Sequence, residues 1–233
     1  APDVSVEDIS LVFIGDFNPK IFHPMWFAHH GLLRDVEAED AQIEVVHQDV
    51  AGFVASWLSI QVLRDRFTAG TKADAYAPHL GDLVQSVFSK LSHSPVKQLG
   101  INVLYRLRFA SAADWHAFGH FVAPKTPWHD VALSPGLRSI HMQVDRGDDH
   151  PGFMVVSIEP DLAKPGDLCI RINDHYEIPK IANSNDRSPV GARWAVDVLH
   201  NGYKVSIERS KRIVDQLIGN FLNTNTVDAG GRK

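Results

Sequence analysis

Residues Leu99–Phe109 read LGINVLYRLRF, and this stretch decides how the rest of the chain is interpreted. Apolar and polar residues alternate along it, which is typical of a strand that buries one face and exposes the other. In this stretch Val103-Leu104 stands before Arg108-Phe109, and earlier in the chain Val62-Leu63 stands before Arg66-Phe67. This short echo predicts that the two halves of the chain repeat one plan.

Upstream of this stretch, strand patterns and helix patterns follow one another. Alternation and β-branched residues predict strands over Ile9–Phe17, Ile43–Val54 and Trp57–Phe67. A short aromatic-rich helix is expected over Phe22–Leu33, and a longer amphipathic helix over Tyr76–Leu91, whose apolar residues recur at three- and four-residue steps. Pro78 suits the first turn of the longer helix.

Downstream, the order is similar, with one more strand. After Leu99–Phe109 we predict a short helix over Ala113–Val122, a hairpin of Leu137–Arg146 with Gly152–Glu159, a strand over Leu168–Ile178 and a helix over Val205–Leu222. The polar, breaker-rich stretch Pro179–Gly191 reads as a loop. The polar tail 223–233 is expected to be mobile.

These elements predict an α+β fold. We expect two βαββα-type, ferredoxin-like halves, about 8–92 and 97–222, which form a largely antiparallel sheet with the helices mainly on one face. The joining segment Ser92–Lys97 is too short for a free linker, so residues 1–233 are predicted to form a single compact unit.

Composition narrows the function classes. The chain has 233 residues, a net charge of −5 and a single cysteine, Cys169. A lone thiol fits a reducing compartment, and no apolar run approaches the roughly 20 residues of a membrane span, so we expect a cytoplasmic protein without a membrane partner. The negative charge disfavours nucleic-acid binding through the phosphate backbone alone. No cofactor is expected, because dinucleotide, P-loop and nucleophile-elbow motifs are absent from the sequence.

A histidine pair gives the first candidate site. His116 and His120 are four residues apart and lie on one face of the expected helix, with His129 as a possible third ligand. A metal-dependent enzyme is therefore one alternative function. The competing interpretation is a capped, partly buried helix whose histidines bond to a neighbouring loop.

Alternation on the expected strands gives the second candidate site. If the polar faces of these strands coincide, they form a groove of arginines, amides and histidines that suits single-stranded nucleic acid or another anionic ligand. The residues of this candidate are Arg106, Arg108, His141, Arg171, Asn173 and His175. The competing interpretation is an ordinary solvated sheet face.

Three tryptophans near helix ends give the third candidate site. Trp26, Trp115 and Trp128 are candidates for anchors of a protein interface, since large aromatic residues often carry such contacts. Such residues are commoner still in a packed core.

Four short runs carry a resemblance to known sequences. They are His93-Ser94-Pro95-Val96, Leu99-Gly100-Ile101-Asn102, Ala123-Pro124-Lys125 and Asn173-Asp174-His175-Tyr176. Through them the chain after residue 40 resembles a group of uncharacterised bacterial proteins of similar length. The resemblance implies a bacterial, cytoplasmic origin and no particular activity.

The sequence therefore favours a non-enzymatic binding or assembly subunit of a bacterial cytoplasmic protein complex. Its partner would be a protein, either a second copy of itself or another subunit. The metal-dependent enzyme and the nucleic-acid or anion-binding protein remain the alternatives.

Overall fold

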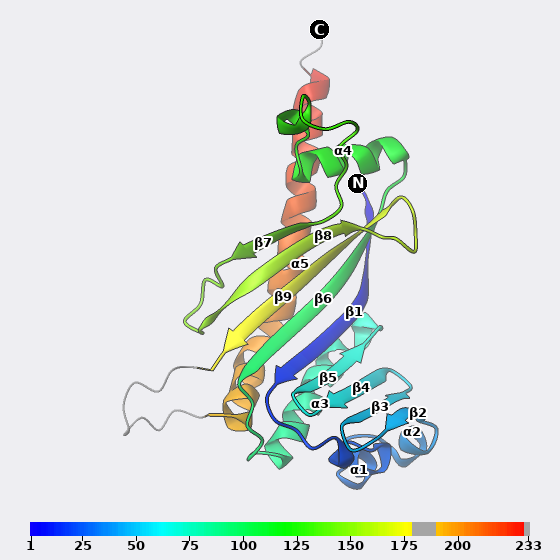
Figure 1. Ribbon diagram of the computed structural model, residues 1–233, viewed down its shortest axis with the longest axis vertical. Helices are drawn as coiled ribbons and strands as arrows, with labels where there is room; N and C mark the ends of the chain where they lie inside the picture. The colour runs from blue at the N-terminus through cyan, green and yellow to red at the C-terminus, as the bar shows by residue number, and fades with distance from the viewer. Residues whose placement is uncertain (179–189, 231–233) are drawn as a thin grey trace.

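The computed structural model describes residues 1–178 and 190–230, with side chains up to residue 224. Within this part of the chain the fold is α+β, with one nine-stranded antiparallel sheet, five α-helices and three short 3-10 turns. Figure 1 shows the sheet in front of two long helices, α3 and α5. The predicted α+β class and antiparallel pairing are confirmed, whereas the sheet is larger than predicted.

The sheet is a single twisted layer. Its strands are β1 Asp3–Ile14, β2 Gln42–Val46, β3 Val50–Ala55, β4 Leu58–Leu63, β5 Arg66–Thr71, β6 Gln98–Arg108, β7 Ile140–Val144, β8 Gly152–Pro160 and β9 Asp167–Glu177. They lie in the order β2-β3-β4-β5-β1-β6-β9-β8-β7. The long strands β1 and β6 pair at the centre, so the two halves of the chain share one sheet.

The helices lie mainly on one side of this sheet. They are α1 Pro24–His29, α2 Asp35–Glu39, α3 Ala77–Lys90, α4 Ala112–Val122 and α5 Ala192–Gly230. Helix α3 contacts β1 and β5, and α5 contacts β6 and β9. Helix α4 packs beside the C-terminal half of α5 at one end of the molecule, and α1 and α2 lie at the other end (Figure 1).

Alternation in the central strands builds the core between the sheet and these helices. In β1 the residues Ile9, Leu11 and Phe13 are fully buried, and every second residue between them is only half-buried. The strands β6 and β9 repeat this pattern. Burial of one apolar side chain contributes roughly 1.5–3 kcal/mol, so this face of the sheet anchors the helices.

Helices α3 and α5 meet at a glycine. A Cβ atom on Gly81 would lie 2.5 Å from the Tyr203 ring, closer than any real contact. The Tyr203 hydroxyl donates a 2.7 Å hydrogen bond to the carbonyl oxygen of Ala77. The absence of a side chain at residue 81 therefore lets the two helices approach closely over the sheet.

Several element boundaries differ from the predictions. The single strands expected over Ile43–Val54 and Trp57–Phe67 are each split by a tight turn, which gives the hairpins β2–β3 and β4–β5. Turns at His47–Asp49 and Arg64-Asp65 interrupt stretches whose composition alone reads as continuous strand. The first half therefore contributes five strands to the sheet.

The predicted ferredoxin-like halves are not confirmed. Each half forms a meander, β2-β3-β4-β5 or β7-β8-β9, and the last strand of the meander pairs with the first strand of that half, β1 or β6. The echo that suggested repetition joins strands that do not correspond, because Val62 and Phe67 lie in β4 and β5 while Val103 and Arg108 both lie in β6.

The last helix is longer than predicted. Helix α5 begins at Ala192, well before the expected start at Val205, and continues to Gly230. At 1.5 Å per residue it is about 58 Å long, which is enough to cross the sheet diagonally and extend beyond it. The loop expected over Pro179–Gly191 lies almost entirely outside the described residues, as do residues 231–233 of the tail, whose mobility stays a prediction.

Candidate functional site

The face of the sheet opposite α3 and α5, which we call the open face, carries most of the predicted ligand-binding residues. Strand register brings them together in rows across β6, β9, β8 and β7. Asn102 lies opposite Asn173, and Leu104 lies opposite Arg171. Arg171 in turn lies opposite Ser157, which lies opposite His141. Strand register therefore places the polar residues of these four strands on one face of the sheet.

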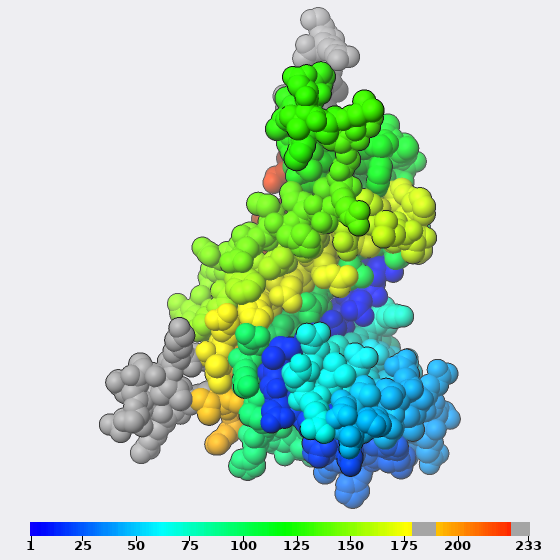
Figure 2. Space-filling model, in the orientation of Figure 1, coloured from blue at the N-terminus to red at the C-terminus, as the bar shows by residue number. Residues whose placement is uncertain are grey.

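The open face continues over the first half of the sheet with small, uncharged polar residues. In the same row as Asn102 lie Ser10, Gly70 and Ser59, from β1, β5 and β4. The next row contains Gly52, Gln61, Thr68, Val12, Gly100, His175 and Phe153. Figure 2 shows this side of the molecule, where strands and not helices form the surface of the central region.

At the centre of the open face two amides are paired. The Asn173 side-chain nitrogen donates a hydrogen bond to the side-chain oxygen of Asn102. Gly100 lies two residues before Asn102, on the same face of β6. A Cβ atom at residue 100 would lie 3.2 Å from the Asn173 side-chain nitrogen, so the glycine leaves space for this amide. The result is a flat floor of amide, hydroxyl and glycine groups.

The arginine side chains at the edge of this floor are already paired. Arg106 contacts Glu7 at 2.6 Å and Asp161 at 2.8 Å, and its guanidinium is largely buried. Arg108 is more exposed and lies 3.8 Å from Asp167. These carboxylates neutralise the two arginines, which leaves them poorly placed to bind phosphate.

Arg171 is an exposed cation of the open face. Burial raises the pKa of the nearby Asp8 carboxyl, although a hydrogen bond from Ser10 and the charges of Arg171 and Lys72 oppose this rise. Asp8 lies opposite Leu104, which separates it from Arg171 by one strand. Positive and negative charge are therefore interspersed on this face.

The two histidines of the candidate site are held by neighbours on the same face. His141 Nδ1 lies 2.8 Å from the Ser157 hydroxyl. The His175 ring packs on Phe153 with centroids 4.7 Å apart, and burial lowers the pKa of His175. A neutral imidazole on an aromatic ring gives this part of the face an amphipathic character.

A hollow of about 530 Å³ opens over β4 and β5 on the open face. Ser59, Gln61, Thr68 and Gly70 form its floor, and Trp57 and Lys72 stand at its rim. The Trp57 ring is stacked on Tyr76 at 5.1 Å, which fixes the aromatic side of the hollow. It is a broad depression suited to a projecting side chain or loop.

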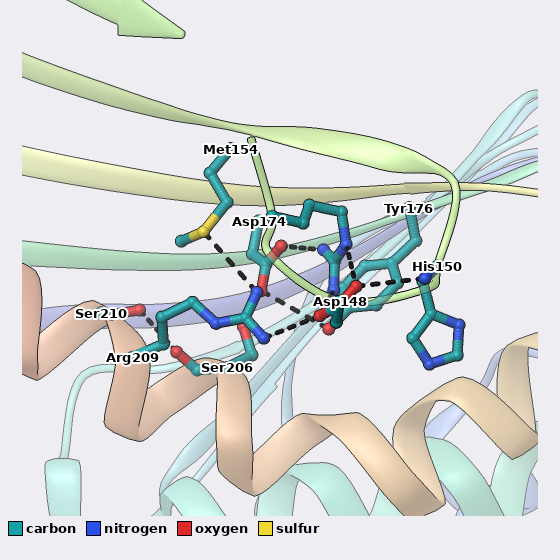
Figure 3. Close-up of polar contacts among 9 residues, drawn as sticks. Asp148, His150, Met154, Asp174, Tyr176, Ser206, Arg209 and Ser210 are labelled. Atoms are coloured by element: carbon teal, nitrogen blue, oxygen red, sulfur yellow. Dashed lines mark hydrogen bonds and ion pairs between the residues drawn. The ribbon is translucent and has the colours of Figure 1, made fainter. Parts of the chain in front are cut away.

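A second polar assembly lies on the opposite, helix-covered face, between β9 and α5. This buried ionic cluster consists of Arg146, Asp148, Asp174 and Arg209, with Tyr176 and Ser206. Figure 3 shows Asp174 and Tyr176 from β9 directed toward Ser206 and Arg209 from α5. Arg146 and Asp148 come from the turn between β7 and β8.

The cluster is a closed network of charges. The fully buried Asp174 accepts hydrogen bonds from Arg146 and, at 2.7 Å, from Ser206. Arg146 also binds Asp148 at 2.7 Å and lies over the Tyr176 ring, 3.5 Å from its centroid. Arg209 binds Asp148 at 2.7 Å. Two guanidinium groups thus face two carboxylates.

Burial and pairing act in opposite directions on these carboxyl groups. Burial raises the pKa of Asp174 despite the hydrogen bond from Ser206 and the arginine charges. At Asp148 burial also raises the pKa, but hydrogen bonds from Arg146 and Arg209 outweigh it and lower the pKa to about 2. Asp148 is therefore a stable carboxylate that holds both arginines.

The buried ionic cluster fits a structural role better than a catalytic one. Among the described residues every buried side-chain nitrogen and oxygen has a hydrogen-bond partner, so the cluster offers no free group to a ligand. Its contacts fasten the β7–β8 turn and strand β9 to α5. These contacts therefore stabilise, from the helix-covered side, the part of the open face that β7, β8 and β9 form.

The predicted metal ligands are not assembled. His116 and His120 are exposed on α4, and His129 is exposed beside Asp130, 3.1 Å away. In the described part of the chain no three His, Cys, Asp or Glu side chains are close enough to hold a metal ion. The described structure therefore gives no geometric support to the alternative of a metal-dependent enzyme that uses these histidines.

The three predicted interface tryptophans have different surroundings. Trp26 packs against Phe27 in the α1 region, and Trp115 donates a 3.3 Å hydrogen bond to the Asp167 carbonyl oxygen; both are half-buried. Trp128, in the segment before β7, is 53% exposed. Of the three, Trp128 is the one whose ring is available to a partner.

Sequence reasoning missed the buried ionic cluster, although a signal was present. In β9 the core-facing positions are Leu168, Ile170, Ile172, Asp174 and Tyr176. Asp174 therefore occupies a position where alternation calls for an apolar residue, and a carboxylate there requires a buried partner. The partner, Arg146, was expected at the end of the hairpin strand Leu137–Arg146, without a buried role.

Comparison with known proteins adds no further identification. No protein-family model matches the chain, and no curated protein matches it either. None of the helices in the described residues is both long and apolar enough to cross a membrane.

Proposed function

We propose that this protein is a non-enzymatic binding subunit that contacts another protein through the open face of its sheet. One observation carries the proposal: α3 and α5 cover one face of the sheet, and the opposite face carries a floor of paired amides, hydroxyls and glycines. An antiparallel sheet commonly leaves one face to solvent, but this one combines polar groups with half-buried apolar residues such as Leu104 and Phe153.

The chemistry of the open face favours a protein partner over a nucleic acid. Single-stranded nucleic acids are bound by unpaired cations and stacking aromatic rings. Here Arg106 and Arg108 are engaged by carboxylates, and the partly buried Asp8 adds a carboxyl group to the same face. A mixed surface of this kind resembles the ordinary composition of protein–protein interfaces.

The electrostatics also favour binding over catalysis. Strongly shifted pKa values mark an active site when they occur in an open cleft. Here the groups of the buried ionic cluster neutralise one another beneath α5. Cys169 has a raised pKa because of burial, which makes its thiol a weak nucleophile.

The same proposal includes the cellular setting and the internal plan of the chain. We infer a bacterial, cytoplasmic protein, supported by the single cysteine and by the sequence resemblance. We also infer that the two halves repeat one plan, supported by the meander that follows the first strand in each half, although the first half has one strand more. The half-repeats differ in their inserts, which are α1 and α2 in one and α4 in the other.

Affinity purification from the source cells with matched variants tests the proposal. Asn173→Lys places a long charged side chain at the centre of the open face, whereas Asn201→Lys places the same side chain on the exposed surface of α5. Partner recovery is quantified by mass spectrometry for both variants and the wild type. Thermal unfolding first verifies that both variants are folded.

We expect a protein that co-purifies with the wild type and with Asn201→Lys to be lost with Asn173→Lys. Equal recovery in all three samples, or recovery of no specific protein, would contradict the proposal. Loss of binding on nuclease treatment would favour the nucleic-acid alternative, and loss on metal chelation would favour the histidine alternative.

A further inference from the structure

The two edges of the sheet are protected to different degrees. An edge strand presents unpaired backbone N–H and C=O groups, and monomeric proteins usually blunt such edges with charges, bulges or prolines. Strand β2 at one edge has both a register irregularity between Ile43 and Val45 and the charged Glu44. It therefore carries the expected protection.

Strand β7 at the other edge has none of these devices. Its sequence, IHMQV over Ile140–Val144, contains no charged residue and no proline, and its pairing with β8 is regular. Four of its residues are exposed, and Met142 has 55% of its surface accessible. An unprotected edge with exposed apolar side chains is the kind of surface that another strand covers.

The apolar residues of β7 all lie on one side. Ile140, Met142 and Val144 pair with Ile158, Val156 and Met154, which are buried. His141 and Gln143 point to the open face. The strand thus offers an apolar row on the helix side and a polar row on the other side.

This sequence is complementary to itself in an antiparallel arrangement. When Met142 is placed opposite Met142 of a second copy, Ile140 falls opposite Val144 and His141 falls opposite Gln143. Apolar residues then meet apolar residues, polar residues meet polar residues, and no like charges are opposed.

The residues that flank the strand can be placed in the same register. Arg138 precedes β7 and Asp145 follows it, and both are exposed. In this register Asp145 falls opposite Ser139, and Arg138 falls opposite Arg146, whose guanidinium is buried in the ionic cluster and bound by Asp148 and Asp174. Another protein's strand would need the alternation of Ile140–Val144 by coincidence, whereas a second copy has it by symmetry.

We propose that the protein forms a homodimer in which two β7 strands pair antiparallel about Met142. The two-fold axis then runs perpendicular to the sheet. Both copies keep their helices on one side and their open faces on the other, so one continuous sheet displays two open faces side by side. This inference deepens the proposed function, because it gives the partner-binding surface a second, symmetry-related copy.

Light scattering after size exclusion tests the dimer. The wild type is expected at about twice the 25.9 kDa chain mass, and Met142→Lys at the chain mass, because two opposed charges destroy the pairing. Met25→Lys is the matched control, since Met25 lies on α1 with a similar exposure of 48%. It should remain dimeric.

A cysteine pair tests the register independently of any destabilisation. In a Cys169→Ser background, Met142→Cys places two thiols at the two-fold axis, with Cα atoms about 4.5–5.5 Å apart. This separation falls within the range of a disulfide. Val144→Cys places its two thiols four residues apart along the strands, about 13 Å, which is too far.

Mild oxidation should therefore cross-link Met142→Cys to a dimer and leave Val144→Cys monomeric. A monomeric wild type, a Met142→Lys variant that stays dimeric, or equal cross-linking at both positions would overturn the proposal. A monomer whose partner binding is still lost with Asn173→Lys would refute the dimer alone. A dimer whose Asn173→Lys variant binds normally would refute the proposed function alone.

Discussion

Asn173 donates a side-chain hydrogen bond to Asn102 across the β6–β9 pair, at the middle of a sheet face that no long helix covers. Two amides joined in this way satisfy part of each other's hydrogen-bonding capacity and leave their remaining groups to solvent. A partner that lies on this face meets these two amides at its centre. The buried ionic cluster and the crossing of α3 and α5 hold this surface in place from the opposite side of the sheet.

The first prediction concerns the buried ionic cluster. Arg146→Met leaves the fully buried Asp174 without its closest cation, and we expect a loss of about 3–5 kcal/mol in the free energy of unfolding. Adding Asp174→Asn to this variant removes the uncompensated charge and should recover part of the loss. Chemical denaturation of both variants and the wild type measures the coupling.

Arg212→Met is the control, because Arg212 is exposed on α5. Its free energy of unfolding should stay within about 0.5 kcal/mol of the wild type. Additive effects of the changes at Arg146 and Asp174 would show that the two side chains do not stabilise each other.

The second prediction concerns acid stability. The pKa of Asp148 is about 2 in the folded protein and 3.8 as a model value, because hydrogen bonds from Arg146 and Arg209 outweigh the effect of burial. Between these values the unfolded chain binds more protons, so stability rises with pH. The contribution of Asp148 is therefore complete above about pH 4 and is lost as the pH falls toward 2.

Asp148→Asn should flatten this part of the stability profile, which thermal unfolding between pH 2 and 6 measures. The neighbouring, exposed Asp149→Asn serves as the control and should keep the wild-type slope. An unchanged slope in Asp148→Asn would contradict the assignment.

The third prediction concerns the crossing of α3 and α5. Helix propensity alone predicts that Gly81→Ala stabilises α3 by about 1 kcal/mol. The Tyr203 ring occupies the space of the new methyl group, so we expect a net loss of about 1–3 kcal/mol instead. Gly219→Ala in α5 has no neighbour within 4 Å and should be neutral or stabilising. Thermal unfolding of the two variants should therefore show shifts of opposite sign, and a stabilised Gly81→Ala would refute the close crossing.

The open face was predictable from the sequence because it depends on local alternation. In LGINVLYRLRF the residues Asn102, Leu104 and Arg106 necessarily share one side of a strand. The pairing register decides whether this side of β6 lies on the same face as the polar sides of β9 and β8. Alternation fixes that register, because the buried residues of all three strands must face the same core.

The sheet size and the buried ionic cluster were harder to predict because they depend on non-local pairing. The turns at His47–Asp49 and Arg64-Asp65 contain no glycine or proline, so composition did not reveal them. Arg146 meets Asp174 only because β7, β8 and β9 form a meander over α5. Only the position of Asp174 on the core side of its strand could have indicated that a buried cation was required.

Site-specific photo-cross-linking in the source cells tests the central claim most directly. A photoreactive residue replaces Arg171, exposed on the open face, or Arg212, exposed on α5. We predict a discrete cross-linked product with another protein from position 171 and none from position 212. Equal products from both positions, or a product from position 212 alone, would contradict the claim that the open face binds the partner.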